Sequence, residues 1–209
     1  MSSVSSLESF IAELCVCASC SRACTREDGR AGGITLLTDT DVGGLFERNL
    51  CGREAGRVDA ALASLRDTRA GSLARGVVAD AGTAAGCQAL IAAEPEADIL
   101  VNNLGVYGVK AFSDISDADW EEIFQINVMS GVRLSRHYAR GMQARGWGRI
   151  QFISSESALN IPTEMVHYGV SKAALQALSR GLAKSLAGTG VTVNTILPGP
   201  TRTEGVTTF

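Results

Sequence analysis

The chain has 209 residues, of which 45% are hydrophobic and 20% are charged, and its formal net charge is −3 at pH 7. This length and composition predict one soluble globular domain with a single sizeable core. The slightly acidic balance disfavours binding to nucleic acid or to an anionic membrane surface. No apolar run reaches the roughly 18 residues that a spanning helix needs, and the N-terminus lacks the pattern of a secretory signal, so we expect a cytoplasmic protein.

The N-terminal segment holds four of the six cysteines, at Cys15, Cys17, Cys20 and Cys24. Closely spaced cysteines bind zinc in some proteins. However, no histidine lies near them, and a helical pattern over residues 7–18 would scatter them around the helix axis. We therefore expect reduced thiols and no metal, with a zinc site as the alternative; disulfides are not expected in a chain without an export signal.

After this segment, residues 34–38 form a short apolar run, and residues 39–44 and a helix-like stretch at 45–50 follow it. From residue 51 onward, helical patterns alternate with apolar runs. The expected helices cover residues 54–68, 83–93, 118–144 and 163–187. The expected strands cover residues 73–79, 98–102, 148–154 and 191–197. This alternation predicts an α/β fold, in which a doubly wound, mostly parallel sheet carries helices on both faces.

Tyr168 and Lys172 lie at positions i and i+4 of the last expected helix, and Ser155 lies at the end of an apolar strand upstream. Side chains at i and i+4 share a helix face, so the ammonium group would favour the phenolate form of the tyrosine. A free tyrosine titrates near 10, and a neighbouring cation would lower that pKa toward the range of a general acid or base. A tyrosine and lysine at this spacing alone would more simply be a surface pair.

Other motifs occur in order along the same stretch. Asp80 ends one expected strand, Asn102-Asn103-Leu104-Gly105 follows the next, Asn127 lies in the long helix, and Pro198, Gly199 and Thr203 follow the last strand. Together with the serine, tyrosine and lysine, they resemble the short-chain dehydrogenase/reductase family over residues 51–209. The resemblance implies a Rossmann-like fold and an NAD(P)-dependent oxidoreductase that interconverts an alcohol and a ketone.

The resemblance also implies a role for each catalytic residue. Tyr168 exchanges a proton with the substrate oxygen, and Ser155 holds that oxygen. Lys172 lowers the pKa of the tyrosine and hydrogen-bonds the nicotinamide ribose. Asn127 interrupts its helix and holds a water that links the lysine to solvent. The two long helices would join subunits into a homodimer or homotetramer.

For the cofactor, the resemblance implies contacts along the ends of the strands. Asn102 and Gly105 would line the adenosine side, Asp80 the adenine, and Thr203 the carboxamide, with Pro198 and Gly199 beside it. Arg53 lies where an arginine would meet the 2′-phosphate, so NADP is slightly favoured over NAD. The substrate itself is not indicated, because the segment that encloses it in the family would follow the Pro-Gly element, and we expect the chain to be truncated there.

Residues 1–50 depart from the family pattern. The family's glycine-rich TGxxxGxG turn, which receives the pyrophosphate, is absent. Residues 39–44 are the nearest candidate, but their two aspartates would repel phosphate, so we interpret them as a surface loop. No apolar run precedes Cys51, so the second strand is also unaccounted for.

The central place of the sheet must still be filled, either by residues 34–38 or by residues 10–16, because an open gap would leave buried backbone groups unpaired. We therefore divide the chain into an atypical segment 1–50, foreign to the family, and a family-like domain 51–209. Two alternatives to an active enzyme stay open: a catalytically incompetent remnant, or a binding protein with a cysteine-rich addition.

Overall fold

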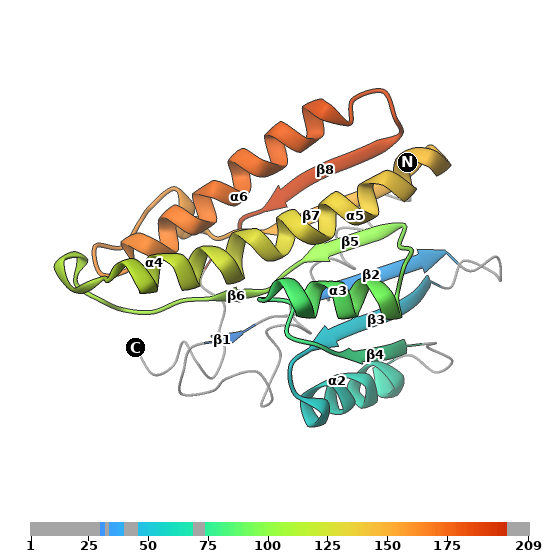
Figure 1. Ribbon diagram of the computed structural model, residues 1–209, viewed down its shortest axis with the longest axis horizontal. Coiled ribbons are helices and arrows are strands. Elements are labelled where there is room, and N and C mark those ends of the chain that lie inside the picture. Colours follow the sequence, from blue (N-terminus) through green and yellow to red (C-terminus); the bar gives the residue numbers. More distant parts are fainter. Residues whose placement is uncertain (1–29, 32–33, 40–45, 69–73, 200–209) are drawn as a thin grey trace.

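A six-stranded sheet forms the centre of the computed structural model, with the strand order β4-β3-β2-β5-β7-β8 (Figure 1). The structure describes residues 30–31, 34–39, 46–68 and 74–199. The strands of this sheet are β2 (Ile34–Asp39), β3 (Phe46–Gly52), β4 (Ala74–Val78), β5 (Ile99–Asn102), β7 (Gly148–Ile153) and β8 (Val191–Ile196). The four N-terminal cysteines, the candidate strand 10–16 and Thr203 lie outside the described residues. The strand order β4-β3-β2-β5-β7-β8 is the doubly wound order predicted from the sequence.

Strand β2 fills the central place, as one of the two alternatives expected, but it runs antiparallel to both neighbours. Ile34 pairs with Asn102 of β5 and with Cys51 of β3, so the amino end of β2 lies at the carboxyl ends of the parallel strands. Only a short connection, residues 40–45, joins β2 to β3. A connection of this length forms a hairpin, whereas a parallel pair needs a crossover of a dozen or more residues. The sheet is therefore mostly parallel, as predicted, and β2 is its one antiparallel strand among the described residues.

Strand β3 differs from what the sequence predicts. Residues 45–50 were expected to be helical, and no residues could be assigned to the family's second strand. Phe46–Gly52 instead pairs antiparallel with β2 and parallel with β4, where Arg48 lies opposite Ala74. The strand forms because the backbone groups of two flanking strands need partners. A search for apolar runs does not detect such a strand.

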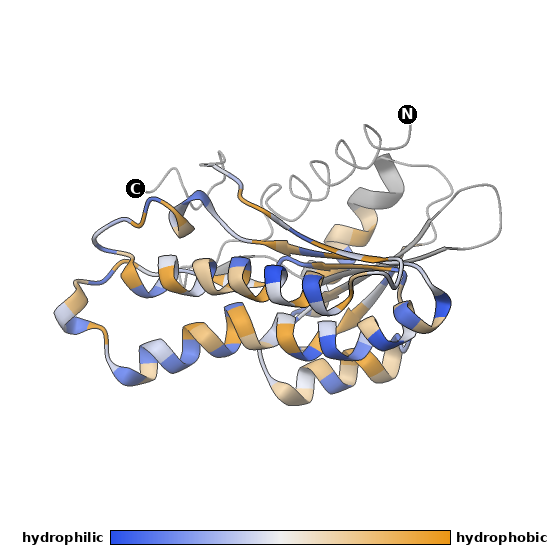
Figure 2. Ribbon diagram, turned by 90° about the horizontal axis from the view of Figure 1, so that it is seen from above, coloured by the Kyte–Doolittle hydropathy of each residue, from blue (hydrophilic) through white to orange (hydrophobic). Residues whose placement is uncertain are grey.

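Helices cover both faces of the sheet (Figure 2). Helix α2 (Ala55–Thr68) places Val58 and Leu62 against one face, where they pack on Ala74 of β4. Gly76 allows this approach, since an added Cβ would lie 2.2 Å from a Val58 methyl carbon. The other face carries α3 (Ala84–Ala93), α5 (Ser130–Arg145) and α6 (Val166–Ser185). All four expected helices are present, with ends shifted by a few residues.

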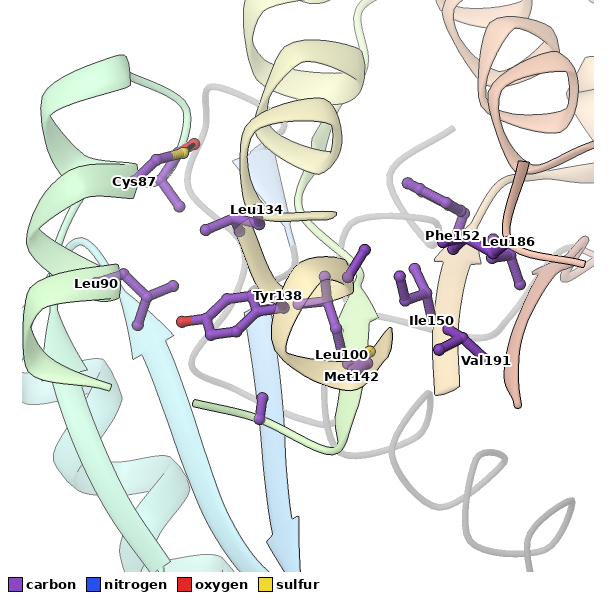
Figure 3. Packing of buried hydrophobic residues seen from close by; sticks show 14 of the residues in the cluster. Cys87, Leu90, Leu100, Leu134, Tyr138, Met142, Ile150, Phe152, Leu186 and Val191 are labelled. Carbon is purple, nitrogen blue, oxygen red and sulfur yellow. Dashed lines mark hydrogen bonds between the residues drawn. The ribbon is translucent and has the colours of Figure 1, made fainter. Parts of the chain in front are cut away.

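The main core lies between these three helices and the sheet (Figure 3). Leu134, Tyr138 and Met142 project from one face of α5 and are almost fully buried, and Leu134 and Tyr138 point toward Cys87 and Leu90 of α3. Ile150 and Phe152 of β7 belong to the same cluster. From α6, Leu175 is buried, and Leu178 and Leu182 pack against the same cluster. Each fully buried aliphatic or aromatic side chain contributes roughly 1.5–3 kcal/mol. The core therefore fixes how α5 and α6 lie beside β7, which carries the serine of the expected site at its carboxyl end.

The long helix expected over residues 118–144 is interrupted. Helix α4 (Asp117–Phe124) begins at a capping box made by Ser116 and Asp119, and it continues into a π-helical turn, η2 (Gln125–Met129), before α5 starts. A π turn inserts an extra residue and often occurs at functional sites. The interruption that the resemblance implied at Asn127 is therefore present.

Two short strands form a separate pair at the carboxyl edge of the sheet. β1 (Arg30–Ala31) lies antiparallel to β6 (Gly105–Val106), which follows β5. Among the described residues, no helix is long and apolar enough to cross a membrane.

Candidate active site

The predicted site residues gather at one edge of the sheet. Ser155 follows β7, Pro198 follows β8, Asn102 ends β5, and Asp80 follows β4. Because these strands are parallel, all of these positions lie at their carboxyl ends. In open α/β sheets, ligands bind in the crevice at this edge.

Ser155 and Tyr168 meet at this edge. The Ser155 side chain lies close enough to the Tyr168 phenol to lower its pKa, and the serine hydroxyl accepts a hydrogen bond from the backbone N–H of Ser157 at 3.1 Å. Ser155 has extended backbone geometry (φ −162°, ψ 157°) and caps the short 3₁₀ helix η3 (Glu156–Ala158). Tyr168 lies in the first turn of α6, and the Tyr107 ring packs against it edge-on at 6.1 Å between centroids. The phenol is therefore held between a hydroxyl and an aromatic ring.

Lys172 is buried one helical turn beyond the tyrosine, with 5% of its surface exposed. Its Nζ donates to the carbonyl oxygen of Ile153 at 2.9 Å and lies 5.7 Å from the centroid of the Tyr168 ring. The backbone carbonyl of Lys172 accepts a hydrogen bond from Ser154 Oγ at 2.8 Å, which ties α6 to the end of β7. Burial lowers the pKa of the ammonium group to about 8.

The acidity of Tyr168 differs from the sequence-based expectation. Burial raises the pKa of the phenol above its ordinary value of 10, and the nearby Ser155 side chain only partly opposes this effect. The lysine was expected to lower this pKa, yet its ammonium group is bonded to Ile153 and does not reach the phenol oxygen by a hydrogen bond. The Tyr168 phenol is therefore protonated at neutral pH.

Asn127 lies in the π turn and is almost fully buried, with 2% of its surface exposed. Its side chain holds β6, since Oδ1 accepts from the Val106 N–H at 2.7 Å and Nδ2 donates to the Val106 carbonyl at 2.9 Å. Nδ2 also donates to Ser171 Oγ at 2.9 Å. The structure therefore brings Asn127, Ser155, Tyr168 and Lys172 into one region of the carboxyl edge.

The predicted cofactor residues border the same edge, with different orientations. Gly105 lies against Lys172, because an added Cβ would be 3.2 Å from its Nζ. Asn102 instead points into the core and donates to Ser135 at 3.3 Å, so its side chain supports the sheet. Asp80 accepts from the Gly82 N–H at 3.1 Å. Arg53 follows β3 and is partly exposed.

The Pro-Gly element lies beside the serine. The carbonyl oxygen of Pro198 accepts from the Glu156 N–H at 3.0 Å, and an added Cβ on Gly199 would lie 3.5 Å from the Glu156 carboxylate. Thr203 lies outside the described residues. Gly105, Pro198 and Gly199 thus surround the catalytic residues on two sides.

A dinucleotide fits this edge only in part. The backbone of Gly105 lies close to Lys172 on the side where the resemblance puts the nicotinamide ribose, because an added Cβ would be 3.2 Å from Nζ. The described residues provide no site for the pyrophosphate half, because β2 ends with Asp39 at the opposite edge of the sheet and no described helix follows it at the carboxyl edge. Strand β1 also pairs with Gly105, on the adenosine side implied by the resemblance.

Residues 39–44, the nearest candidate for a phosphate turn, begin at that opposite edge, where Asp39 pairs with Phe46. Residues 40–44 lie outside the described residues, so their interpretation as a surface loop stays a prediction.

Two neighbours of the catalytic residues were not predicted. Tyr107 contacts the Tyr168 ring, and Ser171 joins Asn127 to α6. Ser171 directly precedes Lys172 in α6, and a helical wheel would have placed it on the side of α6 next to the long helix. Only the fold shows which residue it contacts. His167, which directly precedes Tyr168, is buried edge-on against Trp120. Within the described part of the chain, no three His, Cys, Asp or Glu side chains gather to hold a metal ion.

Comparisons with known proteins agree with this geometry. The profile of the family described as short chain dehydrogenase matches residues 45–209. An uncharacterized oxidoreductase of Bacillus subtilis is 43% identical over 158 residues, which are 76% of this chain and 60% of that protein. A galactitol 2-dehydrogenase (L-tagatose-forming) of Cereibacter sphaeroides is 37% identical over 161 residues, 74% of this chain and 61% of its own length.

Solved structures give the same result. L-sorbose reductase from Gluconobacter frateurii, complexed with NADPH and L-sorbose, has a TM-score of 0.67 at 33% identity, covering 72% of this chain and 59% of that one. The chain spans about three fifths of the length of the fuller matches among its relatives. The profile, the sequence identity and the shared architecture establish that the chain belongs to the short-chain dehydrogenase/reductase family of oxidoreductases.

Proposed function

We propose that this protein is an NAD(P)-dependent oxidoreductase that interconverts a secondary alcohol and a ketone. The observation that carries the proposal is the Tyr168 phenol, which lies beside Ser155 and one helical turn from the buried Lys172. A proton donor and a hydroxyl that share one oxygen position are what the reduction of a carbonyl requires. The nicotinamide supplies the hydride when it is bound.

Each residue has a distinct part in this reaction. Ser155 holds the carbonyl oxygen through its hydroxyl, and Tyr168 donates the proton that this oxygen gains. Because its pKa is raised, the phenol is protonated at neutral pH and can act as the acid in the reduction. Lys172 contributes positive charge behind the phenol, and Asn127 fixes the π turn beside it.

The finer features of the proposal rest on the family. NADP is slightly favoured, because Arg53 follows β3 at the edge where a 2′-phosphate would lie. One relative is named for galactitol and another for acetoacetyl-CoA, and these two compounds have only an alcohol or ketone group in common. We therefore propose that group as the reacting part of the substrate and nothing larger. We also propose that the protein is cytoplasmic and forms a homodimer or homotetramer through α4–α5 and α6.

The test is reduction of small ketones by the purified chain with NADPH or NADH. Tyr168→Phe removes the proton and keeps the ring, so turnover should fall by about 100-fold or more, with nucleotide affinity close to unchanged. Tyr138→Phe is the matched control, because that tyrosine lies in the core and should leave turnover near the parent's. Turnover of Tyr168→Phe within a few-fold of the parent would contradict the assignment.

A second candidate is a catalytically incompetent member of the family. The direction of β2 favours it, since among the described residues no helix N-terminus follows this strand at the carboxyl edge to receive a pyrophosphate. A fluorescence titration with NADPH separates the two candidates. This candidate predicts weak binding or none, and micromolar affinity would exclude it.

A further inference from the structure

A chain of buried hydrogen bonds runs from β6 through the π turn to the tyrosine. Asn127 holds both backbone groups of Val106, and its Nδ2 also donates to Ser171 Oγ at 2.9 Å. The Ser171 hydroxyl in turn donates to the carbonyl oxygen of Tyr168 at 2.7 Å. Strand β6, the π turn η2 and helix α6 are distant in the sequence and are therefore joined through Asn127 and the buried Ser171.

The direction of every bond in this chain is fixed by the available protons. The Val106 N–H needs an acceptor, so the amide oxygen of Asn127 must face it, and both Nδ2 protons are then left for Val106 O and Ser171. The single Ser171 proton goes to Tyr168 O, which leaves a lone pair for Asn127. Ser171 is 0% and Asn127 2% exposed, so water has little access to replace a lost partner.

We propose that Ser171 is a positioning residue for the reaction. By accepting from Asn127 Nδ2 and donating to the Tyr168 carbonyl, it holds the Asn127 amide in the orientation that Val106 requires. It thereby sets the distance between β6 and the turn of α6 that carries Tyr168 and Lys172. The close approach of Gly105 to Lys172 Nζ depends on the same distance. The catalytic part of this role rests on the proposed function, whereas the structural part does not.

Hydrogen exchange of the Val106 amide tests the structural part without turnover. This N–H is bonded to a side chain, so its protection reports on the Asn127 orientation. In Ser171→Ala, its exchange should accelerate by about tenfold or more, because Asn127 loses a buried acceptor. Ser171→Thr keeps the hydroxyl and should stay within about threefold of the parent.

Two controls separate positioning from general destabilisation. The exchange rate of the Ile150 amide in β7 reports global opening. In Ser171→Ala this rate should change far less than the exchange rate of the Val106 amide. Ser179→Ala removes a second buried serine about 12 Å along α6 and should leave Val106 exchange at the parent's rate relative to Ile150. The inference is overturned if Val106 exchange in Ser171→Ala is unchanged, or changes only in step with Ile150.

Kinetics test the catalytic part where the parent reduces a ketone. Ser171→Ala should lower kcat by about tenfold or more with KM within about threefold, and Ser171→Thr should restore kcat. A higher KM at unchanged kcat would overturn the catalytic role. If the parent shows no turnover, the proposed function fails, and the exchange experiment still decides the role of Ser171.

Discussion

Replacing Lys172 by methionine should stabilise the protein at neutral pH, in spite of the lost function. Burial lowers the pKa of this lysine from its ordinary 10.5 to about 8 in the folded protein. The difference, at 1.36 kcal/mol for each pH unit, means that burying the charge costs about 3 kcal/mol below pH 8. Methionine has a similar length and carries no charge, so it removes this cost.

The hydrogen bond from Lys172 to the Ile153 carbonyl works in the opposite direction, because methionine cannot donate. Its loss costs about 1 kcal/mol, which leaves a net gain of about 2 kcal/mol at pH 7. Between pH 8 and 10.5 the unfolded chain binds more protons than the folded one, so the parent gains stability as the pH rises through this window. The variant lacks this titration, and its advantage should disappear by about pH 10.5.

Urea unfolding followed by circular dichroism at several pH values between 7 and 10.5 measures the difference. Lys184→Met, at an exposed position near the end of the same helix, is the matched control and should show no comparable pH dependence. The reasoning is refuted if the difference between Lys172→Met and the parent stays constant across this pH range.

Three further predictions concern packing and thiols. Tyr138→Phe removes the 2.7 Å hydrogen bond to the Glu94 carbonyl and should lower the free energy of unfolding by about 1–2 kcal/mol in urea melts. Gly148→Ala would put a Cβ 2.5 Å from the Met142 Cβ and should cost about 1–3 kcal/mol, whereas Gly181→Ala, with nothing within 4 Å, should raise the melting temperature. Protein purified without chelator should contain well under one zinc ion per chain, and all six thiols should react after denaturation without reduction; stoichiometric zinc by elemental analysis would contradict this.

Local patterns in the sequence determined the elements and much of the candidate site. The spacing of Tyr168 and Lys172 predicted a shared helix face, and the order of the motifs predicted the family, which the comparisons confirm. Apolar runs predicted β4, β5, β7 and β8. Of these, β5 and β7 are buried along nearly their whole length, as expected for strands covered on both faces. Such signals depend only on neighbouring residues and can be read from one sequence.

Only the tertiary structure decided the direction of β2, the existence of β3 and the environment of the tyrosine. Strand direction depends on which partners a strand finds, and β3 forms between two neighbours without an apolar pattern of its own. The sequence predicted a lowered pKa for Tyr168 from the charge of Lys172, but burial raises it. Burial and hydrogen-bond partners come from residues far apart in the chain, such as Val106, Asn127 and Ser171, and are therefore set by the fold.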